Sequence, residues 1–143
     1  LYHQPLDSCL DLFAGTGILG FEALSLGSQF VHFIDKNKRH TKEIQAKASL
    51  LPLSSKSYCI SCLDALTYLK QASAPYGVIF VDPPFDQHLH HSLLQTLAVS
   101  KACGPETLIF LESPCELSLA DTWEVVKEKK IGQVRVYLIK KFR

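Results

Sequence analysis

Short apolar runs alternate with amphipathic segments along the chain, and this alternation is its clearest feature. The apolar runs predict five strands, at residues 9–13, 30–34, 58–62, 78–81 and 107–111. The segments between them predict helices, at residues 18–26, 38–50, 64–69 and 89–99. Strands that alternate with helices indicate an α/β domain with a mostly parallel sheet.

Two more strands are predicted at residues 123–129 and 134–139, and almost nothing separates them. The junction around Ile131 and Gly132 has no room for a helical crossover, so these two strands must be antiparallel. The predicted sheet therefore has seven strands and is mostly parallel, with an antiparallel hairpin at its end. This architecture is typical of Rossmann-like class I methyltransferases, whereas an ordinary dinucleotide-binding domain does not end in such a hairpin.

Asp11 begins a glycine-rich segment, DLFAGTGILG, that leads from the first predicted strand into the first helix. Gly15 and Gly17 permit a tight turn and let backbone N–H groups approach a ligand closely. Together with Gly20, and with Asp35 about twenty residues after the loop, they also satisfy the dinucleotide-binding spacing. Asp11 argues against that interpretation, because its carboxylate would repel a pyrophosphate but attract a sulfonium and an α-amino group.

Acidic residues follow the second and third predicted strands, at the edge where open α/β sheets bind ligands. Asp35 can accept both hydroxyls of a ribose there, and a charge-assisted bond of this kind contributes about 1.5–3 kcal/mol. Asp64 can accept from an adenine amino group. It also fits the N-cap of the following helix, and the two roles are compatible.

The loop Asp82-Pro83-Pro84-Phe85 follows an apolar strand that is expected near the centre of the sheet. Its two prolines fix φ and remove two N–H donors, so the loop is stiff and presents carbonyl groups. If Asp82 and the Pro83 carbonyl each accept one hydrogen of a target amino group, the nitrogen lone pair is free to attack a methyl group. Phe85 would stack on the target base.

Length and composition indicate the size and general class of the protein but do not indicate a function. The chain has 143 residues, 47% of them hydrophobic, and a formal net charge of +1. We expect one monomeric domain over residues 1–143, located in the cytoplasm and without a membrane span. The chain contains no Met and its first motif lies close to residue 1, so we also expect a further segment to precede it.

The basic residues are clustered. The clusters are Lys36, Lys38, Arg39 and Lys42, then Lys127, Lys129 and Lys130, and finally Lys140, Lys141 and Arg143. A nucleic-acid surface and an ordinary solvated face are equally good interpretations of each cluster.

No metal site is expected. Cys59 and Cys62 form a C-x-x-C pair, but residues three apart in a strand point to opposite faces, and no second pair completes four ligands. His88, His90 and His91 are expected at the solvated start of a helix.

The motifs together resemble those of one family. CLDLFAGTG at residues 9–17, VDPPF at 81–85 and GQV at 132–134 resemble the RsmD family of bacterial 16S rRNA guanine-N2 methyltransferases. The resemblance implies S-adenosyl-L-methionine as the cofactor and rRNA, free or in an assembling small ribosomal subunit, as the partner. The residues it implies around the cofactor are Asp11, Phe13, Gly15, Thr16, Gly17, Asp35, Lys36, Asp64 and Ala65. Those it implies around the target guanine are Asp82, Pro83, Pro84 and Phe85. Members of that family carry a basic N-terminal segment, and the resemblance implies that this sequence begins after it.

Other functions stay open. An adenine-N6 methyltransferase acting on DNA or RNA is the nearest alternative, because such enzymes share the first two motifs. A nicotinamide-dependent oxidoreductase could use the same glycine loop. A non-catalytic subunit that only binds nucleic acid is a third alternative, but Asp82 and the two loop glycines argue against it.

Overall fold

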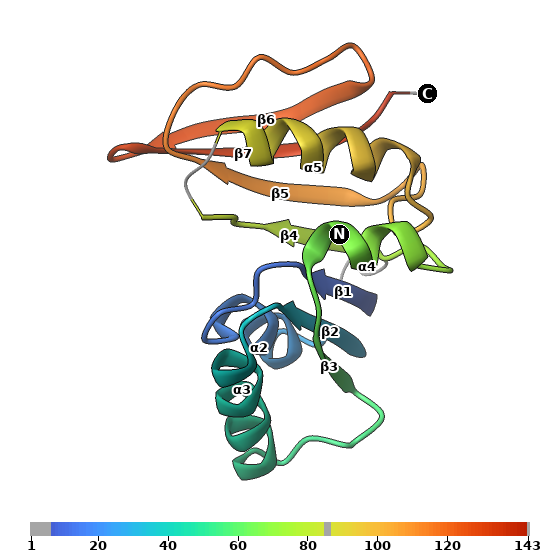
Figure 1. The fold of residues 1–143 in the computed structure, drawn as a ribbon, viewed down its shortest axis with the longest axis vertical. Helices are drawn as coiled ribbons and strands as arrows, with labels where there is room; N and C mark the ends of the chain where they lie inside the picture. Colours follow the sequence, from blue (N-terminus) through green and yellow to red (C-terminus); the bar gives the residue numbers. More distant parts are fainter. Residues whose placement is uncertain (1–6, 85–86, 143) are drawn as a thin grey trace.

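The computed structural model describes residues 7–84 and 87–142, in which strands and helices alternate to form an α/β fold (Figure 1). Its strands are β1 (Ser8–Asp11), β2 (Phe30–Asp35), β3 (Tyr58–Cys62), β4 (Val78–Val81), β5 (Leu108–Ser113), β6 (Trp123–Ile131) and β7 (Val134–Lys141). Its helices are α2 (Ile18–Ser25), α3 (Lys38–Leu50), α4 (Ala65–Gln71) and α5 (Gln87–Val99).

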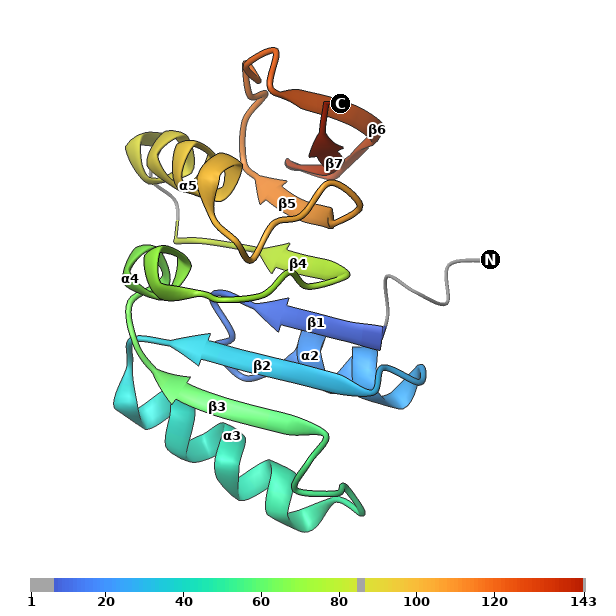
Figure 2. The ribbon, with the colours of Figure 1, turned by 90° about the vertical axis from the view of Figure 1, so that its right-hand side faces the viewer.

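The strands form one seven-stranded sheet in the order β3-β2-β1-β4-β5-β7-β6. The first five strands run parallel, and their carboxyl ends meet at one edge of the sheet (Figure 2). β7 is antiparallel to both β5 and β6, with Gly132 at φ 61° in the turn that joins β6 to β7. The predicted class I methyltransferase architecture, a parallel sheet closed by an antiparallel hairpin, is confirmed.

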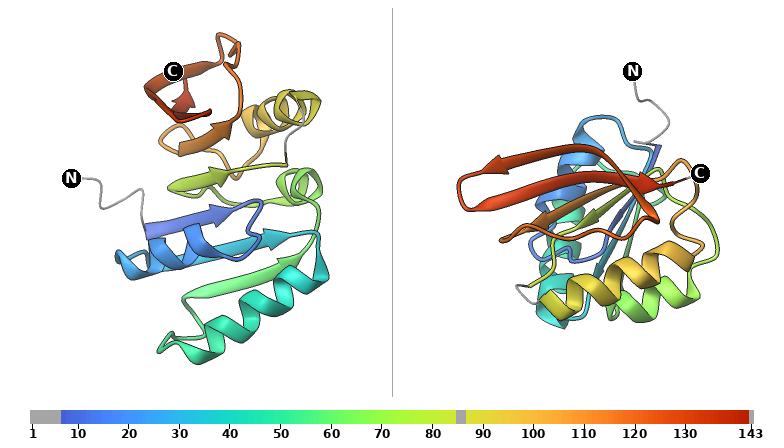
Figure 3. Two further views of the ribbon diagram at one scale, coloured as in Figure 1. Left: turned by 90° about the vertical axis from the view of Figure 1, so that its left-hand side faces the viewer. Right: turned by 90° about the horizontal axis from the view of Figure 1, so that it is seen from above.

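Helices cover the two faces of the sheet in pairs. α2 and α3 lie on one face, over β1 to β3, and α4 and α5 lie on the other face (Figures 1 and 3). Successive strand residues therefore enter different cores: on β1, Cys9 packs with Phe33 and Ile44 on the α2–α3 side, and Leu10 packs with Leu97 on the α4–α5 side. Within the described residues, no helix is both long and apolar enough to cross a bilayer.

Most element boundaries agree with the sequence prediction, and the differences have simple causes. α3, β3 and β4 have the predicted bounds. β1 ends at Asp11 because Leu12 and Phe13 already belong to the turn that leads into the glycine loop. β5 begins and ends later than predicted, and β6 and β7 are longer, because cross-strand pairing extends the hairpin into charged residues.

One sequence expectation is wrong. His90 does not lie on a solvated helix start, because its side chain is buried between α5 and β5, with Nε2 3.1 Å from the Glu112 carbonyl oxygen. His91, the next residue on the helix, is exposed. The side chain of His88 lies outside the described residues.

Candidate active site

The glycine loop joins the carboxyl end of β1 to α2. Gly15 and Gly17 have φ values of 55° and 82°, which side chains disfavour, so glycine is required for this turn. Gly20 lies one turn into α2, where a Cβ atom would collide with the Phe33 ring of β2. The third glycine of the motif therefore brings the helix close to the sheet, and the first two shape the loop.

Asp11 is a buried carboxylate at the foot of this loop. Its side chain is only 2% exposed, and its Oδ2 accepts a hydrogen bond from the Gly20 backbone N–H at 3.3 Å. Burial raises the pKa of Asp11 from 3.8 to about 7, with smaller additions from the charges of Asp82 and Asp35, while the Gly20 hydrogen bond opposes the rise. A buried acid in this position favours a cationic ligand, because a positive charge restores the carboxylate form.

Asp35 ends β2 and holds the glycine loop from the other side. Its Oδ2 accepts from the Gly15 N–H at 2.8 Å, and its Oδ1 accepts from the Asn37 N–H at 2.8 Å. His40 Nδ1 also lies 3.2 Å from Oδ1. A carboxylate has about four lone-pair positions, so capacity for a ribose hydroxyl remains beside these protein partners.

The other predicted cofactor residues surround the same edge of the sheet. Asp64 caps α4, because its Oδ2 accepts from the Thr67 N–H at 3.2 Å, and this confirms the cap interpretation. Of the remaining residues, Thr16 and Lys36 are exposed, Phe13 is half-buried, and Ala65 is buried. Roles for these residues in cofactor binding stay predictions.

The Asp82 loop leaves β4 at the centre of the same edge. Asp82 and Pro84 are exposed, whereas Pro83 between them is buried, so the loop is anchored and its acid faces outward. Asp82 is close enough to Asp11 to raise the pKa of that residue. Phe85, predicted to stack on the target base, lies outside the described residues.

Glu112 lies beside Asp82 at this edge, and the sequence alone did not indicate it as a candidate site residue. β4 and β5 pair in register from Val78–Leu108 to Val81–Leu111. Asp82 is the first residue after β4, and Glu112 is the next residue of β5. Burial raises the pKa of Glu112, and the charge of Asp82 and a hydrogen bond between the two side chains raise it further. The only sequence signal is an acid directly after the apolar run of the fifth strand. This signal points to the site only when the pairing register of β4 and β5 is known.

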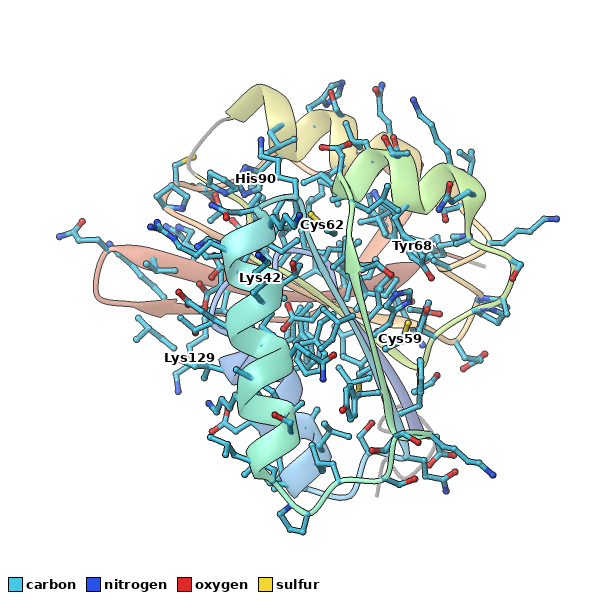
Figure 4. The ribbon with its side chains drawn as sticks, turned by 60° about the horizontal axis from the view of Figure 1, so that its bottom comes forward. Lys42, Cys59, Cys62, Tyr68, His90 and Lys129 are labelled. Atoms are coloured by element: carbon cyan, nitrogen blue, oxygen red, sulfur yellow. The ribbon has the colours of Figure 1, made fainter. Side chains whose placement is uncertain are left out.

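The first basic cluster lies beside this site, and the second does not. Lys36, Lys38, Arg39 and Lys42 are exposed around the start of α3, directly after Asp35. The second cluster lies on the edge strand β6. Figure 4 shows Lys129 of this second cluster on β6 and Lys42 of the first cluster on α3. Figure 4 also shows Cys59 and Cys62 on opposite sides of β3, in agreement with the expected strand geometry.

Solved structures share this fold. A Haemophilus influenzae protein matches with a TM-score of 0.89 and 31% identity, over 99% of this chain and 82% of that one. An Escherichia coli protein matches with a TM-score of 0.86 and 30% identity, over 96% of this chain and 77% of that one. A ribosomal protein L11 methylase from Lactobacillus delbrueckii, at 14% identity and a TM-score of 0.76, shares the fold alone. The fold and the site therefore define a Rossmann-like methyltransferase.

The particular family follows from the sequence. The family described as Conserved hypothetical protein 95 matches residues 3–140, and this chain belongs to it, the RsmD family. Relatives named ribosomal RNA small subunit methyltransferase D are 33% identical over 136 residues in H. influenzae and 32% identical over 129 residues in E. coli. These matches cover 92% and 88% of this chain, which spans 69% and 64% of the two relatives. The resemblance identified from the motifs is confirmed.

Proposed function

We propose that this chain is the catalytic domain of an S-adenosyl-L-methionine-dependent methyltransferase that acts on the 2-amino group of a guanine in 16S rRNA. The observation that carries the proposal is the juxtaposition, at one sheet edge, of a buried acid beneath a glycine loop and an exposed acid on a proline-stiffened loop. The names of the relatives, which specify rRNA of the small subunit, support this substrate class.

The residues of the first loop fit the proposed cofactor. When bound, S-adenosyl-L-methionine supplies a methyl group on a positively charged sulfur. Asp11 would attract the charged amino acid part of the cofactor, since its carboxylate is buried and the hydrogen bond that it accepts from Gly20 N–H is long, at 3.3 Å. Asp35 would accept from the ribose, and the loop around Gly15 and Gly17 allows the backbone to approach the ligand closely.

The second loop fits the target amine. An exocyclic amino group of a base is a poor nucleophile, because its lone pair is delocalised into the ring. Asp82 and the Pro83 carbonyl would each accept one N–H of that group, so that the lone pair points toward the methyl carbon. Alignment of this kind is the main contribution that a protein makes to an in-line displacement. Asp82 would then take the proton that the nitrogen loses once the new N–C bond has formed and the S–C bond has broken.

Mapping modified nucleosides tests the proposal. Ribosomal RNA from cells that lack this protein would be digested and analysed by mass spectrometry, beside rRNA from the parent strain. We expect one N2-methylguanosine of 16S rRNA to disappear, and to return when the protein is supplied. Loss of an N6-methyladenosine instead would favour the adenine alternative, and an unchanged set of modified nucleosides would contradict the proposal.

A further inference from the structure

Four acidic residues form a row across neighbouring strands on one face of the sheet. In spatial order they are Asp35 on β2, Asp11 on β1, Asp82 after β4 and Glu112 on β5. Each lies two residues beyond a strand position whose side chain is on the α2–α3 side of the sheet: Phe33, Cys9, Phe80 and Phe110. Side chains two apart in a strand share a face, so Asp35, Asp11 and Glu112 point to the same side of the carboxyl edge. Asp82 directly follows β4, and its hydrogen bond with Glu112 places its carboxyl beside theirs.

The order of the four acids along the sheet edge leads from the proposed cofactor residues to the residue proposed for the target amine, and then to Glu112. Asp35 and Asp11 belong to the part of the site proposed for the cofactor, and Asp82 to the part proposed for the target amine. Glu112 comes next, on the side of Asp82 that faces away from the cofactor residues. When an amino group lies at Asp82 with its nitrogen toward the methyl donor, the ring that carries this group extends away from the cofactor, toward β5.

We propose that Glu112 is a specificity-determining residue, which accepts the ring N1–H of the target guanine while Asp82 accepts from the neighbouring 2-amino group. This inference rests on the proposed function. Guanine presents N1–H and the 2-amino group side by side as donors, and a pair of adjacent carboxylates matches them. Adenine has an unprotonated N1 beside its amino group, which a carboxylate repels. Glu112 would therefore select guanine by reading its Watson–Crick edge, as enzymes that act on an extruded base do.

The surroundings of Glu112 suit a fixed acceptor. Its backbone is paired with Val136 of β7 on one side, and its carbonyl oxygen contacts His90 Nε2 at 3.1 Å. Two residues before Asp82 and Glu112, Phe80 and Phe110 are paired across β4 and β5, and their ring centroids lie 5.9 Å apart. This ring contact supports the register that places Glu112 beside Asp82. Burial raises the pKa of Glu112, and the nearby charge of Asp82 and the hydrogen bond between the two carboxyl groups raise it further, so the two groups lie close together and compete for a proton. A ligand that offers two adjacent N–H groups relieves this competition.

The test uses RNA fragments that contain the mapped nucleotide as guanine or as 2-aminopurine, which keeps the 2-amino group but has an unprotonated N1. Single-turnover methylation of both fragments would be measured with the wild-type protein and with Glu112→Gln. The amide of glutamine can either accept from N1–H or donate to N1. We expect the wild type to prefer guanine roughly 10- to 100-fold, and Glu112→Gln to reduce this preference to within a few-fold of unity.

The ratio of the two rates separates recognition from folding, because a merely structural effect would lower both rates together. Asp121→Asn, which removes an exposed acid from the loop before β6, is the matched control and should keep the wild-type ratio. An unchanged ratio in Glu112→Gln, with an active wild type, would overturn the role of Glu112 alone. A wild type that forms no N2-methylguanosine would overturn the proposed function, and this inference with it.

Discussion

The Gly15 backbone N–H donates to Asp35 Oδ2 at 2.8 Å, so the acid that ends β2 fixes the loop that follows β1. We expect Asp35→Ala to lower the affinity for S-adenosylhomocysteine by roughly 10- to 100-fold, the equivalent of removing one charge-assisted hydrogen bond. The variant removes the acceptor for Gly15 and Asn37 as well as the proposed ribose contact. Calorimetric titration measures the effect, with Asp121→Asn as control. Unchanged affinity would exclude Asp35 from the cofactor site.

Asp11 predicts a pH dependence of cofactor binding. Its pKa of about 7 means that below pH 7 the free protein carries mainly the protonated form, whereas a cationic ligand favours the carboxylate. Affinity should therefore rise as the pH increases from about 5.5 to 7, by at most about tenfold for each pH unit. Titrations across this range would show it, and proton release would appear as a dependence of the heat on the buffer. In Asp11→Asn the affinity should be low and independent of pH over this range.

Asp11 also predicts a stability cost. Its pKa is higher in the folded chain than its usual value of 3.8, so the unfolded chain loses its proton first and stability falls as the pH rises from about 4 to about 7. The full difference corresponds to roughly 4 kcal/mol, and we expect Asp11→Asn to recover about 1–3 kcal/mol at pH 8. Asparagine keeps an acceptor for Gly20. Urea unfolding at pH 5 and pH 8 measures this. A variant that is less stable than the wild type at pH 8 would contradict it.

Asp82 should affect the chemical step and leave cofactor binding almost unchanged. We expect Asp82→Ala to lower single-turnover methylation about 10²-fold, or roughly 3 kcal/mol, because the target amine then lacks an acceptor. The proposed cofactor residues lie on other strands, so affinity for S-adenosylhomocysteine at pH 8 should stay within a few-fold of wild type. Glu116→Gln, which changes another exposed acid, serves as control. Near-full turnover in Asp82→Ala, or loss of cofactor binding, would refute the role given to this loop.

The basic cluster at the start of α3 predicts salt-dependent binding to RNA. Replacing Lys38, Arg39 and Lys42 together with Gln should weaken binding to 16S rRNA and reduce the slope of log affinity against log salt. The reduction should be about 0.7–0.9 for each phosphate that these side chains no longer neutralise. Lys56→Gln with Lys101→Gln removes exposed charges away from this cluster and should leave the slope unchanged. If the wild type, the triple variant and the double control variant all show the same salt slope, the α3 cluster is an ordinary solvated face and does not contact RNA phosphates.

Local patterns in the sequence predicted most of the fold because helix and strand periods are local properties. The predicted bounds of α3 agree with the structure, where the Asn37 side chain caps the helix start by accepting from the Arg39 and His40 backbone N–H groups. The hairpin was predicted from the short junction at Gly132, but its length depends on pairing between charged strands, as between Lys130 and Arg135. No periodicity in a single segment carries that information.

The candidate site also contains residues that local motifs predict and residues that depend on how distant segments pack together. Asp11 and Asp82 could be predicted because each belongs to a continuous motif that follows an apolar strand. Glu112 could not, since its place beside Asp82 depends on the register between two strands that are separated by a helix. The burial of His90 was also beyond the sequence, because it depends on which face of α5 meets β5.

The position of β7 between β5 and β6 sets an order in which the chain can be assembled during its synthesis. The five parallel strands and their helices are complete by Ser113, so that part can begin to fold as the chain grows from its N-terminal side. β6 emerges next, yet its partner in the sheet is β7, which is made after it. Until β7 has been made, the nine residues of β6 have no strand to pair with in this sheet, and the edge of β5 is uncovered. The lysines and glutamates of β6 are the kind of charged side chains that disfavour pairing of an exposed edge strand with other chains.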